Sequence, residues 1–156
     1  MRAVAFVGWK ESGKTTTILR IGYLLQAWGY RVAVVKSMRE HTLDHAGTDT
    51  SRLAENFGTV VGVGRDGLLI RCLKPDWKEA LAVVGSADYV LFEGFHNIDV
   101  CPRVICAKSA TDVAAQWTGL EIAITGPVAD QPAVRRDLET RYQVLVLSLE
   151  KGAYQL

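Results

Sequence analysis

The chain carries a short glycine-rich segment whose residue types and spacing suit phosphate binding. Residues 8–15 read Gly-Trp-Lys-Glu-Ser-Gly-Lys-Thr and complete the pattern G-x-x-x-x-G-K-[ST]. An apolar run at residues 3–7 precedes the segment and a helix-like stretch begins at Thr16, which is the strand, loop and helix order that the motif requires. Glycine lets backbone N–H groups approach a phosphate closely, and the N-terminus of the following helix adds a favourable dipole. The pattern predicts that the chain binds a nucleoside triphosphate or another phosphorylated ligand.

Each position of this phosphate loop has an expected role. Lys14 is expected to reach the β- and γ-phosphates, the Thr15 hydroxyl to take one Mg²⁺ position, and Thr16 to bond an α-phosphate. Glu11 is expected to point into solvent, because a carboxylate that faced the phosphates would repel them. The residues predicted to bind the nucleotide are Gly8, Glu11, Ser12, Gly13, Lys14, Thr15 and Thr16.

A second acidic group is needed near the metal, and Glu93 is the candidate. It ends the apolar strand pattern at residues 89–92, and Gly94 after it permits a backbone approach to the phosphates. A carboxylate at that place can hold a magnesium-bound water or polarise an attacking water. The alternative interpretation is a solvated acidic residue at a strand end.

The polar segment at residues 37–47 leaves three interpretations open. His41, Asp44 and His45 could form a metal site if the segment were helical. A solvated, charged loop is the simpler alternative. The third is a switch-like loop near the γ-phosphate, with Asp44 or Asp49 near the metal, although Asp49 could instead cap the helix that it begins. The predicted metal ligands are Thr15, Glu93 and Asp49, and the predicted catalytic residues are Lys14, Glu93 and Asp49.

Strand and helix patterns alternate along the chain. Strands are predicted at residues 3–7, 31–36, 59–63, 67–72, 89–92, 103–107, 121–125 and 143–147, and helices at 16–28, 48–57, 75–85, 111–117 and 130–141. This succession predicts a three-layer α/β fold of the P-loop NTPase type, a mostly parallel sheet with helices on both faces. The two strands within residues 59–72 read as a small hairpin that adds an antiparallel edge. The length predicts a single nucleotide-binding domain over residues 1–156, with its ligand at the carboxyl ends of the strands.

Composition narrows the class of protein. Hydrophobic residues make up 49% and charged residues 22% of the chain, and the net charge of +1 does not suggest a nucleic-acid surface. No apolar run reaches membrane-spanning length and no signal-peptide pattern is present, which predicts a cytoplasmic protein without a membrane partner. The odd set of cysteines, Cys72, Cys101 and Cys106, is typical of reduced thiols, with a metal site across a dimer interface as the minor alternative.

The base of the nucleotide is left open by these residues. The guanine-reading pattern N-K-x-D is absent. Asp130 follows a late strand, where base-reading loops often lie, but capping of the next helix explains it equally well. Trp9 and Trp28 are read as packing groups rather than as platforms on which a base stacks.

Three segments together resemble one family. They are residues 8–17, the stretch from Lys36 through Gly-Thr-Asp-Thr-Ser-Arg at 47–52, and Tyr-Val-Leu-Phe-Glu-Gly-Phe at 89–95. Their order and separation are similar to those of molybdopterin-guanine dinucleotide biosynthesis protein B (MobB). The phosphate loop is generic, whereas G-x-D-[ST]-x-R combined with E-G-F discriminates this family from others. The resemblance covers most of the chain, and the last third contributes little to it.

The resemblance implies a small GTPase-type protein of molybdenum-cofactor biosynthesis. Such a protein binds GTP with Mg²⁺, hydrolyses it weakly, assists the MobA-type guanylyltransferase that acts on molybdopterin, and tends to form a homodimer. Carried over to this sequence, Gly8, Gly13, Lys14, Thr15 and Thr16 would hold phosphates and metal, Asp49 and Arg52 would lie in the sensing segment, and Glu93 would face the magnesium or the water.

The sequence departs from the family pattern at three positions, and two other functions stay open. His96 stands where the family usually has lysine, Ser37 where a histidine often follows Lys36, and Ala46 where proline is common. One alternative is a P-loop small-molecule kinase, with a lid drawn from the basic residues Arg135, Arg136 and Arg141. The other is a nucleotide-gated adaptor for another cofactor or metal pathway.

Overall fold

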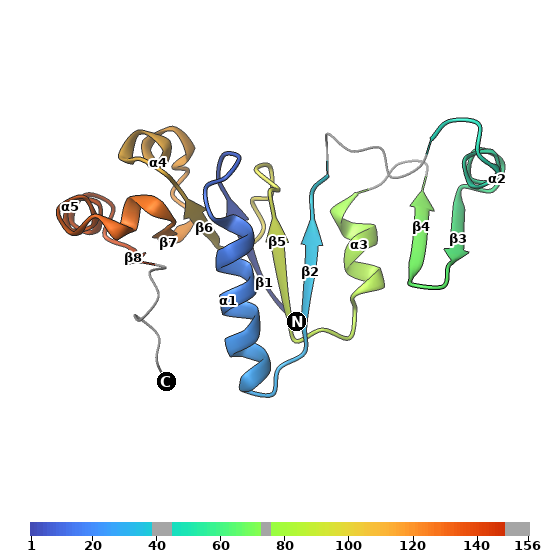
Figure 1. Ribbon diagram of the computed structural model, residues 1–156, viewed down its shortest axis with the longest axis horizontal. Helices are drawn as coiled ribbons and strands as arrows, with labels where there is room; N and C mark the ends of the chain where they lie inside the picture. Colours follow the sequence, from blue (N-terminus) through green and yellow to red (C-terminus); the bar gives the residue numbers. More distant parts are fainter. Residues whose placement is uncertain (39–44, 73–75, 149–156) are drawn as a thin grey trace. The chain divides into compact units, whose positions relative to one another are not determined.

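The chain folds as two compact units. The structure, a computed structural model, describes residues 1–38, 45–72 and 76–148. One unit comprises Met1–Ser37 together with the chain from Ser86 onward, and the other comprises Met38–Gly85 (Figure 1). The single domain expected over residues 1–156 stays a prediction. None of the helices in the described residues is long and apolar enough to cross a membrane.

The first unit is built on a six-stranded sheet with the order β2-β5-β1-β6-β7-β8, in which all neighbouring strands are parallel. Its strands are β1 (Arg2–Val7), β2 (Val32–Lys36), β5 (Tyr89–Glu93), β6 (Arg103–Cys106), β7 (Glu121–Thr125) and β8 (Leu145–Leu147). Its helices are α1 (Lys14–Ala27), α4 (Ala110–Gln116), the 3₁₀ helix η1 (Pro127–Asp130) and α5 (Pro132–Tyr142). The parallel sheet with interleaved helices confirms the predicted fold class.

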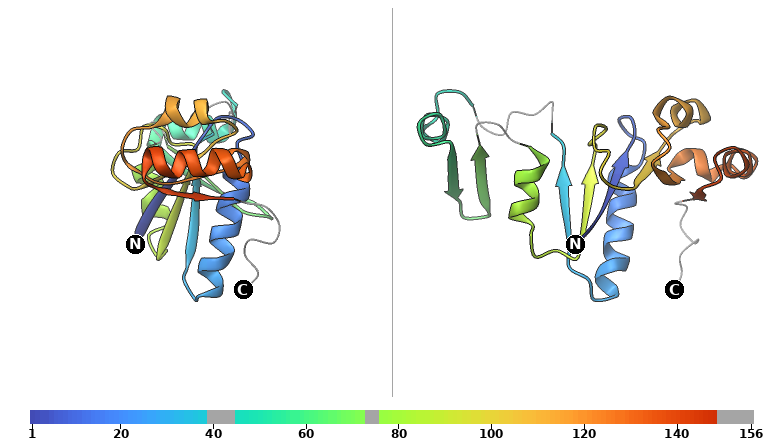
Figure 2. Two further views of the ribbon diagram at one scale, coloured as in Figure 1. Left: turned by 90° about the vertical axis from the view of Figure 1, so that its left-hand side faces the viewer. Right: turned by 180° about the vertical axis from the view of Figure 1, so that it is seen from behind.

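Helices cover both faces of this sheet. Ile18 and Leu25 of α1 join a core cluster with Phe6 of β1, whereas Val113 of α4 and Leu138 of α5 join a cluster with Val7. Successive residues of a strand point to opposite faces, so α1 lies on one face and α4 and α5 on the other. Figure 2 shows α4 and α5 at the end of the sheet that holds β6, β7 and β8. The three layers are therefore helix, sheet and helix.

The strand register places the carboxyl ends of β1, β2 and β5 side by side. Glu93, the last residue of β5, lies beside Phe6 of β1 and beside Lys36, the last residue of β2. The chain continues this pairing past the strands, since the Gly94 N–H donates to the Phe6 carbonyl and the Ser37 N–H to the Glu93 carbonyl. The phosphate loop, Lys36 and Glu93 thus share the carboxyl edge of the sheet, where ligands of such folds bind.

The second unit contains α2 (Asp49–Phe57), β3 (Thr59–Val63), β4 (Leu68–Cys72) and α3 (Trp77–Val83). β3 and β4 form the predicted hairpin, but as a separate two-stranded sheet, so the expectation that it adds an edge to the main sheet is wrong. The hairpin packs against α2 instead, where Arg71 Nη2 donates to Ser51 Oγ at 3.2 Å. Alternation of residue types predicts a strand, whereas the choice of sheet depends on these tertiary contacts.

Several helix ends differ from the sequence prediction. The α1 helix begins at Lys14 rather than at Thr16, so the phosphate loop runs directly into it. Asp49 is the first residue of α2, and its neighbour Thr48 is the cap, with Thr48 Oγ1 accepting from the Ser51 N–H at 3.1 Å. Asp130 lies in η1 rather than at the cap of α5, and its carboxylate accepts a hydrogen bond from Ser148. Pro75, expected in the first turn of α3, lies outside the described residues.

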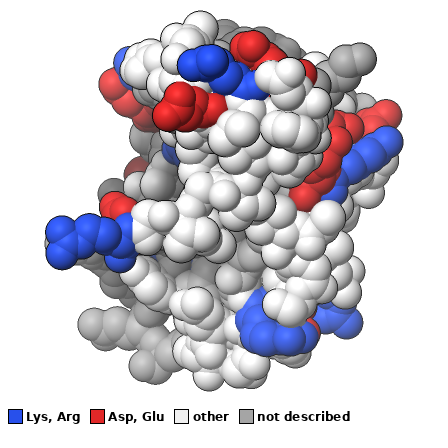
Figure 3. Space-filling view, turned by 90° about the vertical axis from the view of Figure 1, so that its right-hand side faces the viewer, with Lys and Arg blue, Asp and Glu red and all other residues white. Residues whose placement is uncertain are grey.

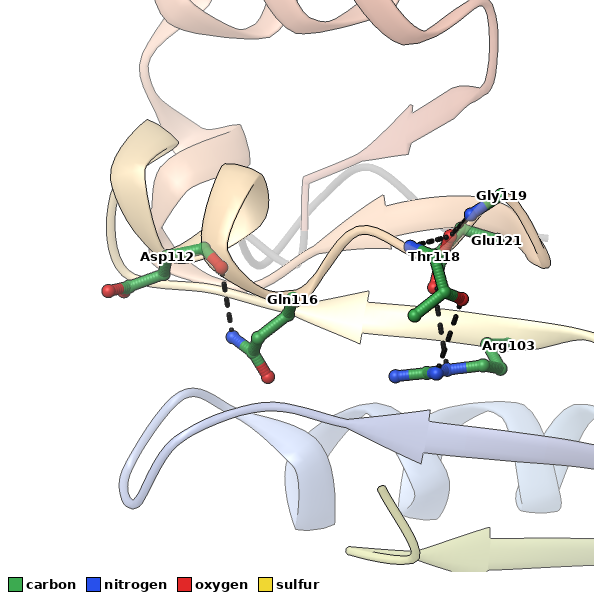
Figure 4. A network of polar contacts seen from close by, with 6 residues as sticks. All are labelled: Arg103, Asp112, Gln116, Thr118, Gly119 and Glu121. Atoms are coloured by element: carbon green, nitrogen blue, oxygen red, sulfur yellow. Dashed lines mark hydrogen bonds and ion pairs between the residues drawn. The ribbon is translucent and has the colours of Figure 1, made fainter. Parts of the chain in front are cut away.

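A buried ion pair joins the amino ends of β6 and β7 (Figure 4). Arg103 Nε lies 3.4 Å from Glu121 Oε1, and the two side chains are 6% and 0% exposed. Glu121 also accepts hydrogen bonds from the Thr118 N–H, the Thr118 hydroxyl and the Gly119 N–H at 3.0, 2.8 and 2.8 Å. One carboxylate therefore fixes the turn before β7 and compensates a buried cation.

The variant Glu121→Gln is expected to lower the free energy of unfolding by about 1–3 kcal/mol. An amide removes the charge that compensates Arg103 and places an N–H₂ group against backbone N–H donors. Urea denaturation followed by circular dichroism measures the change, with Glu139→Gln on an exposed position of α5 as the matched control. Equal unfolding free energies for the two variants would contradict this role of Glu121.

Candidate functional site

The phosphate loop lies between β1 and α1 and keeps its amides open. Gly13 is the N-cap of α1, no side chain caps it, and the first turn contains no acidic residue. The first N–H groups of a helix lack intrahelical partners, so this terminus of a 14-residue helix presents donors and a positive dipole end. Glu11 takes a φ of 61° and its side chain is exposed, as expected for a carboxylate kept away from phosphates.

Close packing explains the first glycine of the loop. A Cβ at Gly8 would lie 2.2 Å from the Cys106 carbonyl oxygen and 2.4 Å from Ser12 Oγ, so no side chain fits there. Ser12 is buried, and its hydroxyl has no hydrogen-bond partner among the described residues. Its side chain faces inward, which leaves its backbone as the group available to a phosphate.

The Lys14 side chain folds back over the loop. Its Nζ donates to the Gly8 carbonyl at 2.9 Å and to the Trp9 carbonyl at 2.6 Å. Burial lowers the pKa of Lys14 from its ordinary value, while the nearby Cys106 and Glu93 act in the opposite direction. In the described structure the ammonium is therefore held on backbone oxygens of the phosphate loop.

Glu93 is the centre of a polar bridge between three elements. Its Oε1 accepts from Thr15 Oγ1 at 2.9 Å and from Lys36 Nζ at 2.7 Å, and its side chain is 8% exposed. Thr15 and Glu93 were predicted separately as metal ligands, and the fold brings them within hydrogen-bond distance. Hydroxyl and carboxylate oxygens at the edge of a phosphate loop fit the donor set that Mg²⁺ prefers.

Lys36 was matched to the family pattern by sequence but was given no role. Its place beside Glu93 follows from the parallel pairing of β2 with β5. The sequence did contain an indication that Lys36 belongs to the site. Lys36 ends β2 just as Glu93 ends β5, and the carboxyl ends of parallel strands lie at one sheet edge. It adds a second cation to the site.

Asp49 lies in the second unit, which is described by itself. Its side chain is 97% exposed and lies 4.0 Å from Arg52 Nη1, the other residue of the predicted sensing segment. Its place at the metal stays a prediction, as do the catalytic roles of Lys14 and Glu93. His41 and Asp44 lie outside the described residues, and the His45 carbonyl accepts from Thr48. Among the described residues, no group of His, Cys, Asp and Glu side chains has the arrangement of a metal site.

Beneath the loop lies Cys106, the last residue of β6. It is fully buried, and its Sγ lies 3.8 Å from Thr17 Oγ1, whose hydroxyl donates to the Gly13 carbonyl at 2.9 Å. Burial raises the pKa of the Cys106 thiol to about 11, so it stays protonated at neutral pH. All three cysteines are free, as the sequence indicates.

The two tryptophans of interest have different surroundings. Trp9 in the phosphate loop is 50% exposed, and its indole stacks on the His96 imidazole with ring centroids 6.0 Å apart and an interplanar angle of 27°. Trp28 follows α1 and is 63% exposed, so its interpretation as a packing group is wrong. The basic residues considered for a kinase lid, Arg135, Arg136 and Arg141, all lie on α5.

Comparison with known proteins shows a family and a fold. The family model described as molybdopterin guanine dinucleotide synthesis protein B matches residues 3–125. A Methanocaldococcus jannaschii protein named as a molybdopterin-guanine dinucleotide biosynthesis adapter protein is 32% identical over 99 residues, which cover 61% of this chain and 41% of that protein. The chain thus spans less than half the length of this relative.

Two solved structures share the fold. MobB of Bacillus subtilis is 25% identical, with a TM-score of 0.57 over 89% of this chain and 97% of that one. A MobB homolog from Bacillus stearothermophilus is 21% identical, with a TM-score of 0.59 over 90% of this chain and 100% of that one. The architecture of the two structures supports the P-loop fold derived above from the strand order and the layers.

Proposed function

The chain belongs to the molybdopterin guanine dinucleotide synthesis protein B (MobB) family, and we propose that it is a magnesium-dependent GTP-binding protein that hydrolyses GTP slowly. The observation that carries this proposal is the bridge of Thr15 to Glu93, at 2.9 Å, beside an uncapped helix N-terminus. That arrangement has amides for phosphates and oxygen donors for a cation at one sheet edge.

The residues divide the work as follows. The loop amides and Lys14 hold the β- and γ-phosphates, and Thr15 and Glu93 hold the Mg²⁺ or its water ligands, with Asp49 as a further candidate. Bound Mg²⁺ supplies charge neutralisation at the transferring phosphate. Lys36, 2.7 Å from Glu93, keeps that carboxylate compensated when no metal is bound. Slow hydrolysis suits a protein that signals to a partner for as long as GTP stays bound.

The pathway is molybdenum-cofactor biosynthesis. The relative from Methanocaldococcus jannaschii is named as an adapter protein for molybdopterin-guanine dinucleotide biosynthesis, and this supports a role beside a MobA-type guanylyltransferase that attaches a guanine nucleotide to molybdopterin. In this role, the nucleotide-bound chain assists the transferase. The alternatives, a small-molecule kinase or an adaptor for another cofactor or metal pathway, share the phosphate loop and differ in acceptor and partner.

Calorimetric titration with GTP, GDP and ATP, each with and without Mg²⁺, tests the proposal. We expect Mg²⁺-dependent binding of GTP that is tighter than binding of ATP, followed by slow release of inorganic phosphate. ATP affinity equal to or above GTP affinity would contradict the choice of base. Phosphate transfer to a metabolite that exceeds hydrolysis by water would favour the kinase.

The variant Glu93→Gln is expected to lower the Mg²⁺-dependent hydrolysis rate at least about tenfold, because an amide is a weak ligand for a hard cation. Binding of GTP without Mg²⁺ should not weaken, since the substitution removes a negative charge near the phosphates. Phosphate release and titration on the same preparations measure both quantities, with Glu139→Gln as the control. Unchanged Mg²⁺-dependent hydrolysis would place the acidic group elsewhere.

A homodimer completes the proposal, and the β3–β4 hairpin is the candidate surface. Opposite pairs Val61–Ile70 and Val63–Leu68 share one face, and these side chains are 55%, 37%, 82% and 68% exposed. In Figure 3, uncharged side chains fill the middle of the view, and the charged ones lie around them. The hairpin packs against α2, but a two-stranded sheet with an exposed apolar face gains stability when that face is covered, as a second copy would do.

Sedimentation equilibrium tests the dimer. Wild type is expected to dimerise, and the double variant Val63→Lys/Leu68→Lys to remain monomeric, because buried ammonium groups oppose association. A wild-type monomer at every concentration would rule out the homodimer, whereas a dimeric double variant would move the interface away from the hairpin.

A further inference from the structure

We infer that His96 is a positioning residue for the phosphate loop, acting through the stack of its imidazole on the Trp9 indole. The inference rests on the proposed nucleotide binding and adds to it a contact between two loops that lie far apart in the sequence. Trp9 is the second residue of the phosphate loop, and His96 follows Glu93 by three positions. Their ring centroids lie 6.0 Å apart with an interplanar angle of 27°.

The loop that presents His96 is itself anchored. Phe95 packs edge-on against Phe92 of β5, with ring centroids 5.4 Å apart, and Ile98 is 3% exposed. The His96 N–H donates to the Gly94 carbonyl at 3.1 Å, and the Ile98 N–H to the Phe95 carbonyl at 3.3 Å. Apolar contacts on both sides of His96 and a tight turn therefore fix the backbone that carries its imidazole to the core of the first unit.

The phosphate loop, in contrast, is exposed where Trp9 lies. Trp9 is 50% exposed, Lys10 and Glu11 are exposed, and Glu11 takes a φ of 61°. In the described structure, Lys14 steadies this stretch through the Gly8 and Trp9 carbonyls. A phosphate in the loop would draw the Lys14 ammonium away from those carbonyls. The Trp9–His96 stack remains as a side-chain contact that keeps the loop in shape when Lys14 turns to the ligand.

A preorganised loop binds more tightly, because less conformational entropy is lost on binding. Aromatic pairs are worth enough to matter here, and removing one from the loop should weaken GTP binding about three- to tenfold. The effect acts through the shape of the loop, so a flat ring in place of the imidazole should preserve it. His96 thus links the segment that carries Glu93 to the segment that carries Lys14.

A set of variants tests this positioning role through rescue and non-additivity. His96→Ala and Trp9→Ala should each weaken GTP binding about three- to tenfold, and the double variant should be no weaker than either single one. His96→Phe, which keeps a flat ring, should restore wild-type affinity. Trp28→Ala, an exposed tryptophan beyond α1, is the control and should bind as wild type does. Wild-type affinity in His96→Ala, additive single effects, or failure of His96→Phe to rescue would each overturn the inference.

Hydrogen exchange of the ligand-free protein separates this inference from the proposed function. His96→Ala should speed amide exchange several-fold in residues 8–13, with β1 unchanged, and His96→Phe should reverse the change. If wild type bound no GTP but the exchange followed this pattern, the proposed function would fall and the positioning role would stand. If wild type bound GTP and His96→Ala changed neither exchange nor affinity, the positioning role alone would fall.

Discussion

Replacing Lys14 with alanine is expected to weaken GTP binding at least about 100-fold while the protein stays folded. Charge-assisted hydrogen bonds are worth about 1.5–3 kcal/mol each, and the proposed function has Lys14 make one to each of two phosphates. Two such bonds correspond to a loss between about 100-fold and 10⁴-fold. Calorimetric titration with Mg²⁺ and GTP, run beside thermal unfolding of the same samples, measures the two expected effects.

The expected stability of the Lys14→Ala variant follows from the surroundings of the side chain. Lys14 is only partly buried, and the two carbonyls that it contacts, those of Gly8 and Trp9, belong to a loop at the surface edge of the sheet. Water can replace the lost ammonium, so the unfolding midpoint should change little. A small loss of loop order before ligand binding is expected, and it would add to the loss of affinity.

The control for this variant is Arg136→Ala, which removes one positive charge from an exposed position on α5 of the same unit. It should bind GTP as wild type does. Comparable losses in the two variants would mean that net charge alone, rather than contact with the phosphates, determines affinity. GTP binding that survives Lys14→Ala in full would show that residues 8–15 are not the nucleotide site.

The local parts of this site could be predicted from the sequence, because they depend on residues close together in the chain. The pattern at residues 8–15 requires a strand before it and a helix after it, and both are present as β1 and α1. Glu11 is exposed as expected, because that expectation depended only on the repulsion between its carboxylate and phosphates bound in the same loop. Glu93 was found because an acidic residue directly after a buried strand must lie at a sheet edge.

The contact between Thr15 and Glu93 could not be predicted as a distance. The two residues are 78 positions apart, and only the strand order β2-β5-β1 places them together with Lys36. Such an order is a tertiary property that no local periodicity encodes. The same limit explains the hairpin, whose strands were predicted but whose separation from the main sheet was not.

Capping residues were ambiguous for a different reason. Asp49 and Thr48 are adjacent, and both residue types cap helices well, so the sequence alone does not choose between them. In the structure Thr48 is the N-cap, and Asp49 lies in the first turn of α2. Asp130 was similarly divided between capping and base reading, and it instead accepts a hydrogen bond from Ser148.

The turn that follows β7, at Thr125–Gly126–Pro127, comes close to the phosphate loop. Gly126 follows β7 with φ 97° and ψ −171°, a conformation that is nearly restricted to glycine. A Cβ there would lie 2.6 Å from the Ser12 carbonyl oxygen and 2.7 Å from the Ala107 carbonyl oxygen. Because Gly126 has no side chain, the end of β7 can approach the phosphate loop closely at Ser12.

Substituting Gly126 with alanine should destabilise the protein by about 2–5 kcal/mol, the sum of backbone strain and of overpacking. The clash is with backbone atoms, which cannot rotate away, so the phosphate loop must move at Ser12. We therefore also expect GTP affinity to fall at least about tenfold, because the loop amides act only in one arrangement. Urea denaturation and calorimetric titration of one preparation measure both losses.

Gly119→Ala is the matched control, since Gly119 has a similar φ of 91° but no atom within 4 Å of the position that a Cβ would take. It should cost only about 1–2 kcal/mol, the price of a positive φ without a clash, and should leave GTP binding intact. The difference between the two glycine variants measures the effect of the close contacts with Ser12 and Ala107. Equal losses of stability, with affinity unchanged in both, would mean that the close approach of β7 does not shape the phosphate loop.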